Sequence, residues 1–206
     1  MARKIDIIIF DLGAVLIDWN PRYMYRTIFE TERKVEWFLE HICTGDWNEN
    51  QDAGYPLAKA TEELAARHPE WENEIRAYYG RWIEMLGGAI DDSVEVLKQL
   101  RKNPSYKIYA LTNWSAETFP KALERFDFLH WFDGVVVSGA EKTRKPFADF
   151  YHILLNRYNI NPTTALLIDD NLRNIKGAET LGINGIHFTD AASLKVELND
   201  NFGIKI

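Results

Sequence analysis

Three carboxylates in this sequence stand at the ends of apolar runs. Asp11 follows the run 5–10, and Asp169 and Asp170 follow the run 165–168. Short runs rich in β-branched residues and bounded by polar residues are typical of strands buried on both faces. In open α/β sheets, reactive groups lie just beyond the carboxyl ends of such strands. Carboxylates that lie close together there repel each other, and a bound cation would relieve that repulsion. The pattern therefore predicts a reaction that uses these carboxylates together with Mg²⁺, which prefers oxygen ligands.

A hydroxyl and an ammonium extend this set. Thr112 and Asn113 end a third apolar run, 107–111, and Lys145 lies directly before Pro146. Because the carboxyl ends of parallel strands share one edge of a sheet, residues far apart in the sequence are expected to converge there. A carboxylate nucleophile, further carboxylates, a hydroxyl with backbone N–H groups and one ammonium suit phosphoryl transfer, in which positioning and electrostatics carry most of the catalysis.

Each of these groups also has a purely structural interpretation. Asp169 and Asp170 could cap the helix that follows them, since carboxylates are favoured at helix N-termini. Thr112 and Asn113 could form only a turn, and Lys145 could be a solvated surface residue. The residue types alone leave both interpretations open.

The elements that must position these groups are predicted from apolar periodicity. Strands are expected over 5–10, 107–111, 134–138, 165–168 and 185–188, with helices between them. Strands that alternate with helices require right-handed crossovers. The sequence therefore predicts an α/β fold with a doubly wound parallel sheet.

Residues 19–87 depart from this alternation. They are rich in helix formers and aromatic residues. We predict an inserted four-helix cap here, with the polar segment 44–54 as a loop. The catalytic core then comprises residues 1–18 and 88–206. A lid over the strand ends would exclude water and contact the leaving group.

Substrate specificity is expected to depend on the cap and on one bulky residue of the core. Trp19 lies where the chain enters the cap, and Trp47 and Asn48 lie in the predicted loop, which could face the strand ends. Trp114 directly follows Asn113 and would narrow the pocket. Aromatic residues in the cap are otherwise expected to form its core.

Composition excludes several classes of function. The chain has 206 residues and a formal net charge of −7, which argues against a general nucleic-acid surface. We find no apolar run of the roughly 20 residues that span a bilayer, and no signal-peptide pattern. The single cysteine, Cys43, is expected to be a buried thiol. We therefore expect a cytoplasmic protein that binds neither nucleic acid nor membrane. The substrate is expected to be a small molecule, and the sequence leaves open whether the protein is a monomer or a dimer.

The ordered segments 10–13, 111–113, 145–146 and 168–171 resemble the four motifs of the haloacid dehalogenase superfamily. The resemblance covers essentially the whole chain, and the helical insert looks like the first-type cap of that superfamily. Among its members, the sequence is similar to the glucose-1-phosphate phosphatase-like and 2-haloacid dehalogenase-like proteins. The resemblance implies a hydrolase in which Asp11 is the nucleophile and forms an aspartyl-phosphate.

The same resemblance implies roles for the other motif residues. Thr112 and the backbone of Asn113 would hold phosphoryl oxygens, and Lys145 would neutralise the charge on the nucleophile and the phosphate. The Mg²⁺ ligands would be the carboxylates of Asp11 and Asp170 and the carbonyl oxygen of Gly13, with Asp169 assisting directly or through water.

Gly13 departs from the superfamily's pattern. Phosphatases of the superfamily usually carry a second aspartate at this position. That aspartate protonates the leaving oxygen, which typically raises the reaction rate by about 10²–10⁴-fold. Ala14 also stands where glycine is usual. Solvent or a cap residue within 46–52 could replace the missing acid.

Three interpretations follow from this departure. The first is a Mg²⁺-dependent phosphatase of a small phosphorylated metabolite with a good leaving group, such as a sugar phosphate. The second is a 2-haloacid dehalogenase, which would use Asp11 without a metal. The third is a non-catalytic binding module, since fold alone does not fix function. The adjacent carboxylates of Asp169 and Asp170 resemble a metal site and favour the phosphatase.

Overall fold

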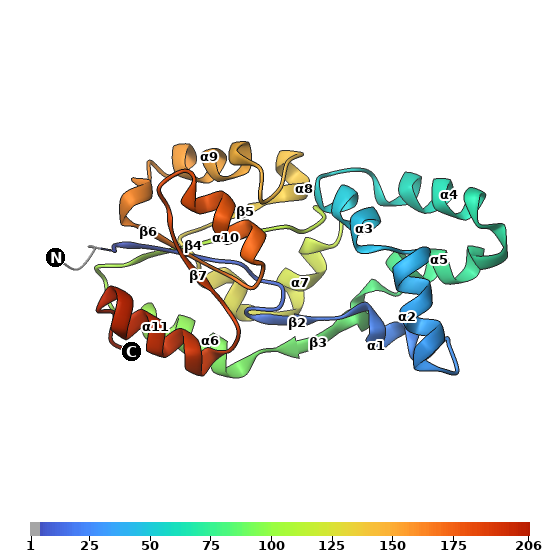
Figure 1. The fold of residues 1–206 in the computed structure, drawn as a ribbon, viewed down its shortest axis with the longest axis horizontal. Helices are drawn as coiled ribbons and strands as arrows, with labels where there is room; N and C mark the ends of the chain where they lie inside the picture. The colour runs from blue at the N-terminus through green and yellow to red at the C-terminus, as the bar shows by residue number, and fades with distance from the viewer. Residues whose placement is uncertain (1–4) are drawn as a thin grey trace.

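A five-stranded parallel sheet forms the centre of the protein (Figure 1). The computed structural model describes residues 5–206. The strands are β1 (Ile7–Phe10), β4 (Lys107–Thr112), β5 (Gly134–Val137), β6 (Ala165–Asp169) and β7 (Asn184–His187). Their order is β5-β4-β1-β6-β7, so the chain winds outward from β1 in both directions. The predicted doubly wound sheet is confirmed.

Alternate residues of β1 enter two different apolar cores, because helices cover both faces of the sheet. Ile8 and Phe10 pack into one cluster, with residues of α6 (Asp91–Leu100), α7 (Phe119–Arg125) and α11 (Ala191–Phe202). Ile9 packs into the other cluster, with α9 (Ala148–Arg157) and α10 (Leu172–Glu179). Side chains of a strand point alternately to the two faces. A strand buried on both faces must therefore be apolar throughout, as β1 is.

Residues 19–87, which we call the cap, are mainly helical and lie beyond the carboxyl ends of the strands (Figure 1). The four predicted helices are present as α1 (Pro21–Tyr25), α2 (Glu32–His41), α4 (Leu57–Arg67) and α5 (Glu72–Gly80). The first of these helices, α1, has only five residues, and α5 is followed by a 3₁₀ turn, Trp82–Met85. Cys43 is buried in the cap, as predicted.

The prediction of a loop over residues 44–54 is wrong. This segment contains a further helix, α3 (Gly45–Asp52). Thr44 caps it by accepting a hydrogen bond from the backbone N–H of Trp47 at 3.1 Å, and Asp46 lies in its first turn, where a negative charge is favourable. Gln51 is its one buried residue, so the sequence carries little apolar periodicity.

The cap joins the core through two short strands that were not predicted from the sequence. β2 (Ile17–Trp19) pairs antiparallel with β3 (Leu86–Ala89). Backbone hydrogen bonds extend the pair at both ends, from Asn20 N–H to the Met85 carbonyl and from Ile90 N–H to the Leu16 carbonyl. The two connections between cap and core therefore run as one ribbon.

A tight loop carries the chain from β1 into β2. Ala14 adopts the left-handed conformation, with φ of 57°, and its N–H donates to the Ile17 carbonyl at 2.8 Å. Non-glycine residues rarely adopt this conformation. The geometry explains why glycine suits this position.

A short helix, α8 (Ser138–Glu141), follows β5. Within residues 5–206, no helix is both long and apolar enough to cross a membrane.

Candidate active site

Lys145 lies between two carboxylates at the carboxyl edge of the sheet. Its Nζ is 3.0 Å from Oδ1 of Asp11 and 2.6 Å from Oδ2 of Asp169, and its side chain is completely buried. Asp11 follows β1 and Asp169 ends β6, and these strands are neighbours in the sheet. The topology thus brings together three charged groups that are far apart in the sequence, as the sequence analysis predicts. The interpretation of Lys145 as a solvated surface residue is wrong.

The side chain of Asn113 fixes the backbone of Lys145. Its Nδ2 donates to the Lys145 carbonyl at 3.0 Å, and its Oδ1 accepts from the Lys145 N–H at 2.9 Å. Both ends of the amide are therefore used to hold the lysine. This leaves the backbone of Asn113, and not its side chain, for any contact with an anion beyond β4.

Asp169 is held by hydrogen bonds to both of its oxygens. Oδ1 accepts from the Asn171 N–H at 2.9 Å and from Asn174 Nδ2 at 2.9 Å, and Oδ2 accepts from Lys145 and, at 3.1 Å, from Asn174. Asn171 caps α10 through its own side chain. Asp169 therefore orients the lysine.

Three carboxylates lie close enough together to hold one metal ion. One carboxylate oxygen from each of Asp11, Asp169 and Asp170 lies within 4.8 Å of the other two. A ligand set made only of oxygens suits Mg²⁺ better than softer metals. Since the two oxygens of Asp169 are already occupied by donors, Asp11 and Asp170 are the better direct ligands.

Burial and the neighbouring charges shift the pKa values of the groups in this cluster. Burial raises the pKa of Asp11 to about 7, although the Lys145 charge opposes this, and the charges of Asp169 and Asp170 raise it further. Burial and the Asp169 charge also raise the pKa of Asp170. Burial disfavours the charged form of Lys145, but the two carboxylates outweigh it and hold its pKa above the ordinary value. The lysine stays protonated, and the cluster still favours an added cation.

The hydroxyl of Thr112 is buried without a partner. Thr112 is fully buried at the end of β4, and its Oγ1 accepts or donates no hydrogen bond among residues 5–206. Leaving a buried polar group unpaired typically costs about 1–3 kcal/mol. An oxygen of a bound anion beside β4 would satisfy this donor.

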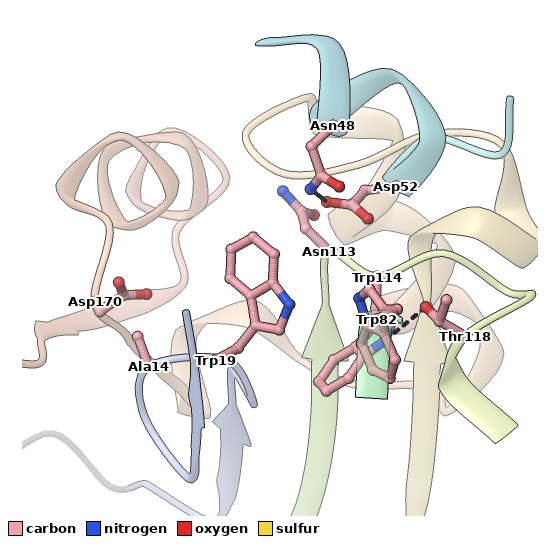
Figure 2. A pocket seen from close by; sticks show the side chains of 10 residues that line it. Ala14, Trp19, Asn48, Asp52, Trp82, Asn113, Trp114, Thr118 and Asp170 are labelled. Atoms are coloured by element: carbon pink, nitrogen blue, oxygen red, sulfur yellow. Dashed lines mark hydrogen bonds between the residues drawn. The ribbon is translucent and has the colours of Figure 1, made fainter. Parts of the chain in front are cut away.

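A cavity of about 200 Å³ separates the strand ends from the cap. Gly13, Asn113 and Asp170 line it on the side of the core. Figure 2 shows Asp170 on one side of this space and Asn48 and Asp52, from α3, above Asn113. The cavity therefore joins the carboxylate cluster to the cap.

Tryptophans form much of the remaining wall. Trp19, Trp82 and Trp114 line the cavity. Trp82 and Trp114 pack edge to face with ring centroids 5.7 Å apart, and Nε1 of Trp114 donates to Oγ1 of Thr118 at 3.1 Å. The two indoles are thus held in place, and they present aromatic surface to whatever enters.

The structure brings three of the four predicted specificity residues to this cavity. Trp19, Asn48 and Trp114 line it. Trp47 does not line this cavity. Its ring packs against that of Tyr78, with the ring centroids 5.1 Å apart, and it lines a separate cavity on the other side of α3. Because the predicted loop is a helix, adjacent residues 47 and 48 point in different directions.

Three further residues that line the cavity were not singled out from the sequence: Asp52, which was included only within the segment 46–52 that could replace the missing acid, and Trp82 and Thr118. Asp52 stands four residues after Asn48, a spacing that places both on one face of a helix, and their side chains are hydrogen bonded at 2.9 Å. That spacing would have identified Asp52 if the helix had been recognised. The sequence offers no comparable signal for Trp82 or Thr118.

The helix α3 is pinned to the core by charged groups. Glu49 bridges Arg144 at 2.6 Å and Arg173 at 2.5 Å, each arginine contacting a different carboxylate oxygen. The hydroxyl of Ser138 donates to the backbone carbonyl of Asp52 at 2.5 Å. These contacts hold the cap closed over the cavity.

Residues 5–182 match the family of haloacid dehalogenase-like hydrolases. The chain belongs to this family. Among named relatives, a sesquiterpene phosphatase of Aspergillus oryzae is 26% identical over 98% of this chain and 100% of its own length. A phosphorylated carbohydrates phosphatase of Thermotoga maritima is 23% identical over 88% of this chain and 84% of its own.

The fold is also shared with solved hydrolases of this family. A family enzyme of Bacteroides thetaiotaomicron, crystallised with magnesium and inorganic phosphate, superimposes with a TM-score of 0.67 at 19% identity, covering 90% of this chain and 95% of the other. The family match over residues 5–182 confirms the predicted membership of the haloacid dehalogenase superfamily.

Proposed function

We propose that this hydrolase is a Mg²⁺-dependent phosphatase of a small phosphorylated metabolite, acting through an aspartyl-phosphate on Asp11. The observation that carries the proposal is the arrangement around Lys145, which contacts both Asp11 and Asp169 beside the unpaired hydroxyl of Thr112. A nucleophile, a fixed cation and an unsatisfied hydroxyl at one strand edge match what a phosphoryl group requires.

Each residue has a role in this chemistry. A carboxylate oxygen of Asp11 would attack phosphorus, and Lys145 would balance the charge of the nucleophile and the phosphoryl oxygens. The Thr112 hydroxyl and the backbone N–H beyond β4 would donate to those oxygens. Asp11, Asp170 and the carbonyl of Gly13 would hold Mg²⁺, with Asp169 acting through water. The ion, when bound, would supply further charge neutralisation.

The walls of the cavity bear on the class of substrate. At about 200 Å³ the cavity is smaller than the roughly 300–1,000 Å³ of typical ligand pockets. Three tryptophans line it, so the leaving group is expected to be compact and to present an apolar face. Both a sugar ring, through its C–H face, and a small apolar alcohol satisfy this description.

Two relatives support the phosphatase over the dehalogenase. The sesquiterpene phosphatase and the phosphorylated carbohydrates phosphatase, by their names, remove phosphate. The acidic cluster also favours the phosphatase, because three neighbouring carboxylates would repel the carboxylate of a 2-haloacid.

A panel of phosphomonoesters tests the proposal. We expect phosphate release with Mg²⁺, its loss in EDTA, and a loss of at least about 10³-fold in the Asp11→Asn variant, which keeps the shape of the side chain but not its nucleophile. Sugar phosphates and apolar alkyl phosphates in the panel separate the two leaving-group classes. Chloride release from 2-chloropropionate without metal, in the absence of any phosphatase activity, would refute the proposal in favour of the dehalogenase.

A further inference from the structure

A phosphomonoester of an alcohol releases an oxygen that must gain a proton, and Gly13 carries no group that could supply it. Among the described residues that line the cavity, two carry a carboxyl group, Asp170 and Asp52. Asp170 belongs to the cluster with Asp11 and Asp169. Asp52 comes from the cap and lies outside that cluster, so it is free for proton transfer.

We propose that Asp52 is the general acid and base of the reaction, an inference that rests on the proposed phosphatase function. In the first step an oxygen of Asp11 bonds to phosphorus and the bond from phosphorus to the leaving oxygen breaks, while the Asp52 carboxyl gives that oxygen its proton. In the second step the Asp52 carboxylate takes a proton from water, which attacks phosphorus and breaks the bond to Asp11. Both aspartates are then restored.

The carboxyl group of Asp52 is positioned by both cap and core. Asn48 Nδ2 donates to its Oδ2 at 2.9 Å, and the hydroxyl of Tyr79 donates to Asn48 Oδ1 at 3.0 Å, which fixes the orientation of the amide. From the core, the backbone N–H of Ser115 donates to the carboxylate and the Ser138 hydroxyl holds the backbone carbonyl. In Figure 2, Asp52 and Asn48 lie over Asn113, across the cavity from Asp170.

The surroundings of Asp52 allow it to act in both protonation states. The charged and titratable groups that face it are Glu49 of the same helix, Arg144 of the core, and Tyr78 and Tyr79 of α5. Burial is the main influence and raises the pKa of Asp52 to about 7; the Ser115 N–H, Arg144 and Asn48 lower it, and Glu49 raises it. Burial keeps both tyrosines neutral. A pKa near the working pH suits a group that gives and then regains a proton.

Two esters of similar shape separate acid catalysis from a structural role. The leaving group of p-nitrophenyl phosphate departs without a proton, whereas that of 2-phenylethyl phosphate needs one. In the Asp52→Asn variant with Mg²⁺, we expect kcat/KM to fall by about 10²–10⁴-fold for the alkyl ester and by less than about tenfold for the nitrophenyl ester. The control is Asp46→Asn, an exposed carboxylate at the start of the same helix, which should leave both values unchanged.

The pH profile of the unmodified enzyme gives a second test that needs no variant. Because the protonated carboxyl is required only for the alkyl ester, the ratio of kcat/KM for 2-phenylethyl phosphate to kcat/KM for the nitrophenyl ester should fall as pH rises through about 7. Ionisation of the nucleophile Asp11 affects both esters alike and cancels in this ratio. The role of Asp52 is refuted if the Asp52→Asn variant loses activity on both esters equally, or loses activity on neither. Identical pH profiles for the two esters, or hydrolysis of the nitrophenyl ester alone, also refute it. If the unmodified enzyme hydrolyses neither these two esters nor any other phosphomonoester of the panel, the phosphatase function itself is refuted.

Discussion

Replacing Lys145 by methionine tests the charge arrangement on which the site depends. Methionine has a similar length and no charge, so the change removes the ammonium and leaves Asp11 and Asp169 buried without it. Breaking a buried ion pair by removing one partner typically costs about 3–5 kcal/mol. Two carboxylates lose a partner here, but Asp169 keeps its donors from Asn171 and Asn174. We therefore expect a loss of about 3–5 kcal/mol in the free energy of unfolding, and not twice that value.

Urea denaturation at pH 8 in EDTA measures this loss. Lys176→Met is the matched control, because Lys176 is exposed on the neighbouring helix α10 and its replacement should change stability by no more than about 0.5 kcal/mol. Added Mg²⁺ should stabilise the Lys145→Met variant more than the unmodified protein, since carboxylates without their internal cation bind an external one more tightly. Stability equal to that of the control variant, or an equal response to Mg²⁺, would show that Lys145 does not balance this cluster.

Two further predictions concern the cap. Because burial holds the pKa of Asp52 at about 7 instead of 3.8, the contribution of Asp52 to stability should be lost as pH rises from about 4 to 7. Between pH 5 and pH 8, the free energy of unfolding of the Asp52→Asn variant should therefore fall by less than that of the unmodified protein, by up to about 3 kcal/mol in urea denaturation. Glu49→Gln removes the charge that bridges Arg144 and Arg173 and should raise KM several-fold by loosening the closed cap. Glu62→Gln, in an exposed ion pair with Arg76, is its control and should leave KM unchanged; equal KM values for the two variants would contradict the role of Glu49.

The core could be predicted from the sequence because its strands are buried on both faces. Burial of that kind requires uninterrupted apolar runs, such as 165–168, and the polar residues that end them mark the reactive edge. The side chains of Asp11, Thr112, Lys145 and Asp169 accordingly lie at that edge, as predicted.

The parts that could not be predicted are held by tertiary contacts. The helix α3 is polar, with Gln51 as its one buried residue, and Glu49 ties it to core arginines that are distant in the sequence. Its capping residue, Thr44, is a weak signal in a segment that otherwise resembles a loop. Since the helix was missed, Asp52 could not be placed beside Asn48. The strands β2 and β3 are too short, and β3 too rich in glycine, to show a pattern.

The pairing of β2 with β3 restricts how substrate can enter. Two separate connecting segments would let the cap rotate and shift relative to the core. A hydrogen-bonded pair of strands instead bends most easily in the direction perpendicular to the plane of the pair. Opening is therefore expected to be a swing in one direction that carries Trp19, at the end of β2, away with it. Closing along the same path would then return the Trp19 indole and the Asp52 carboxyl together to the strand ends.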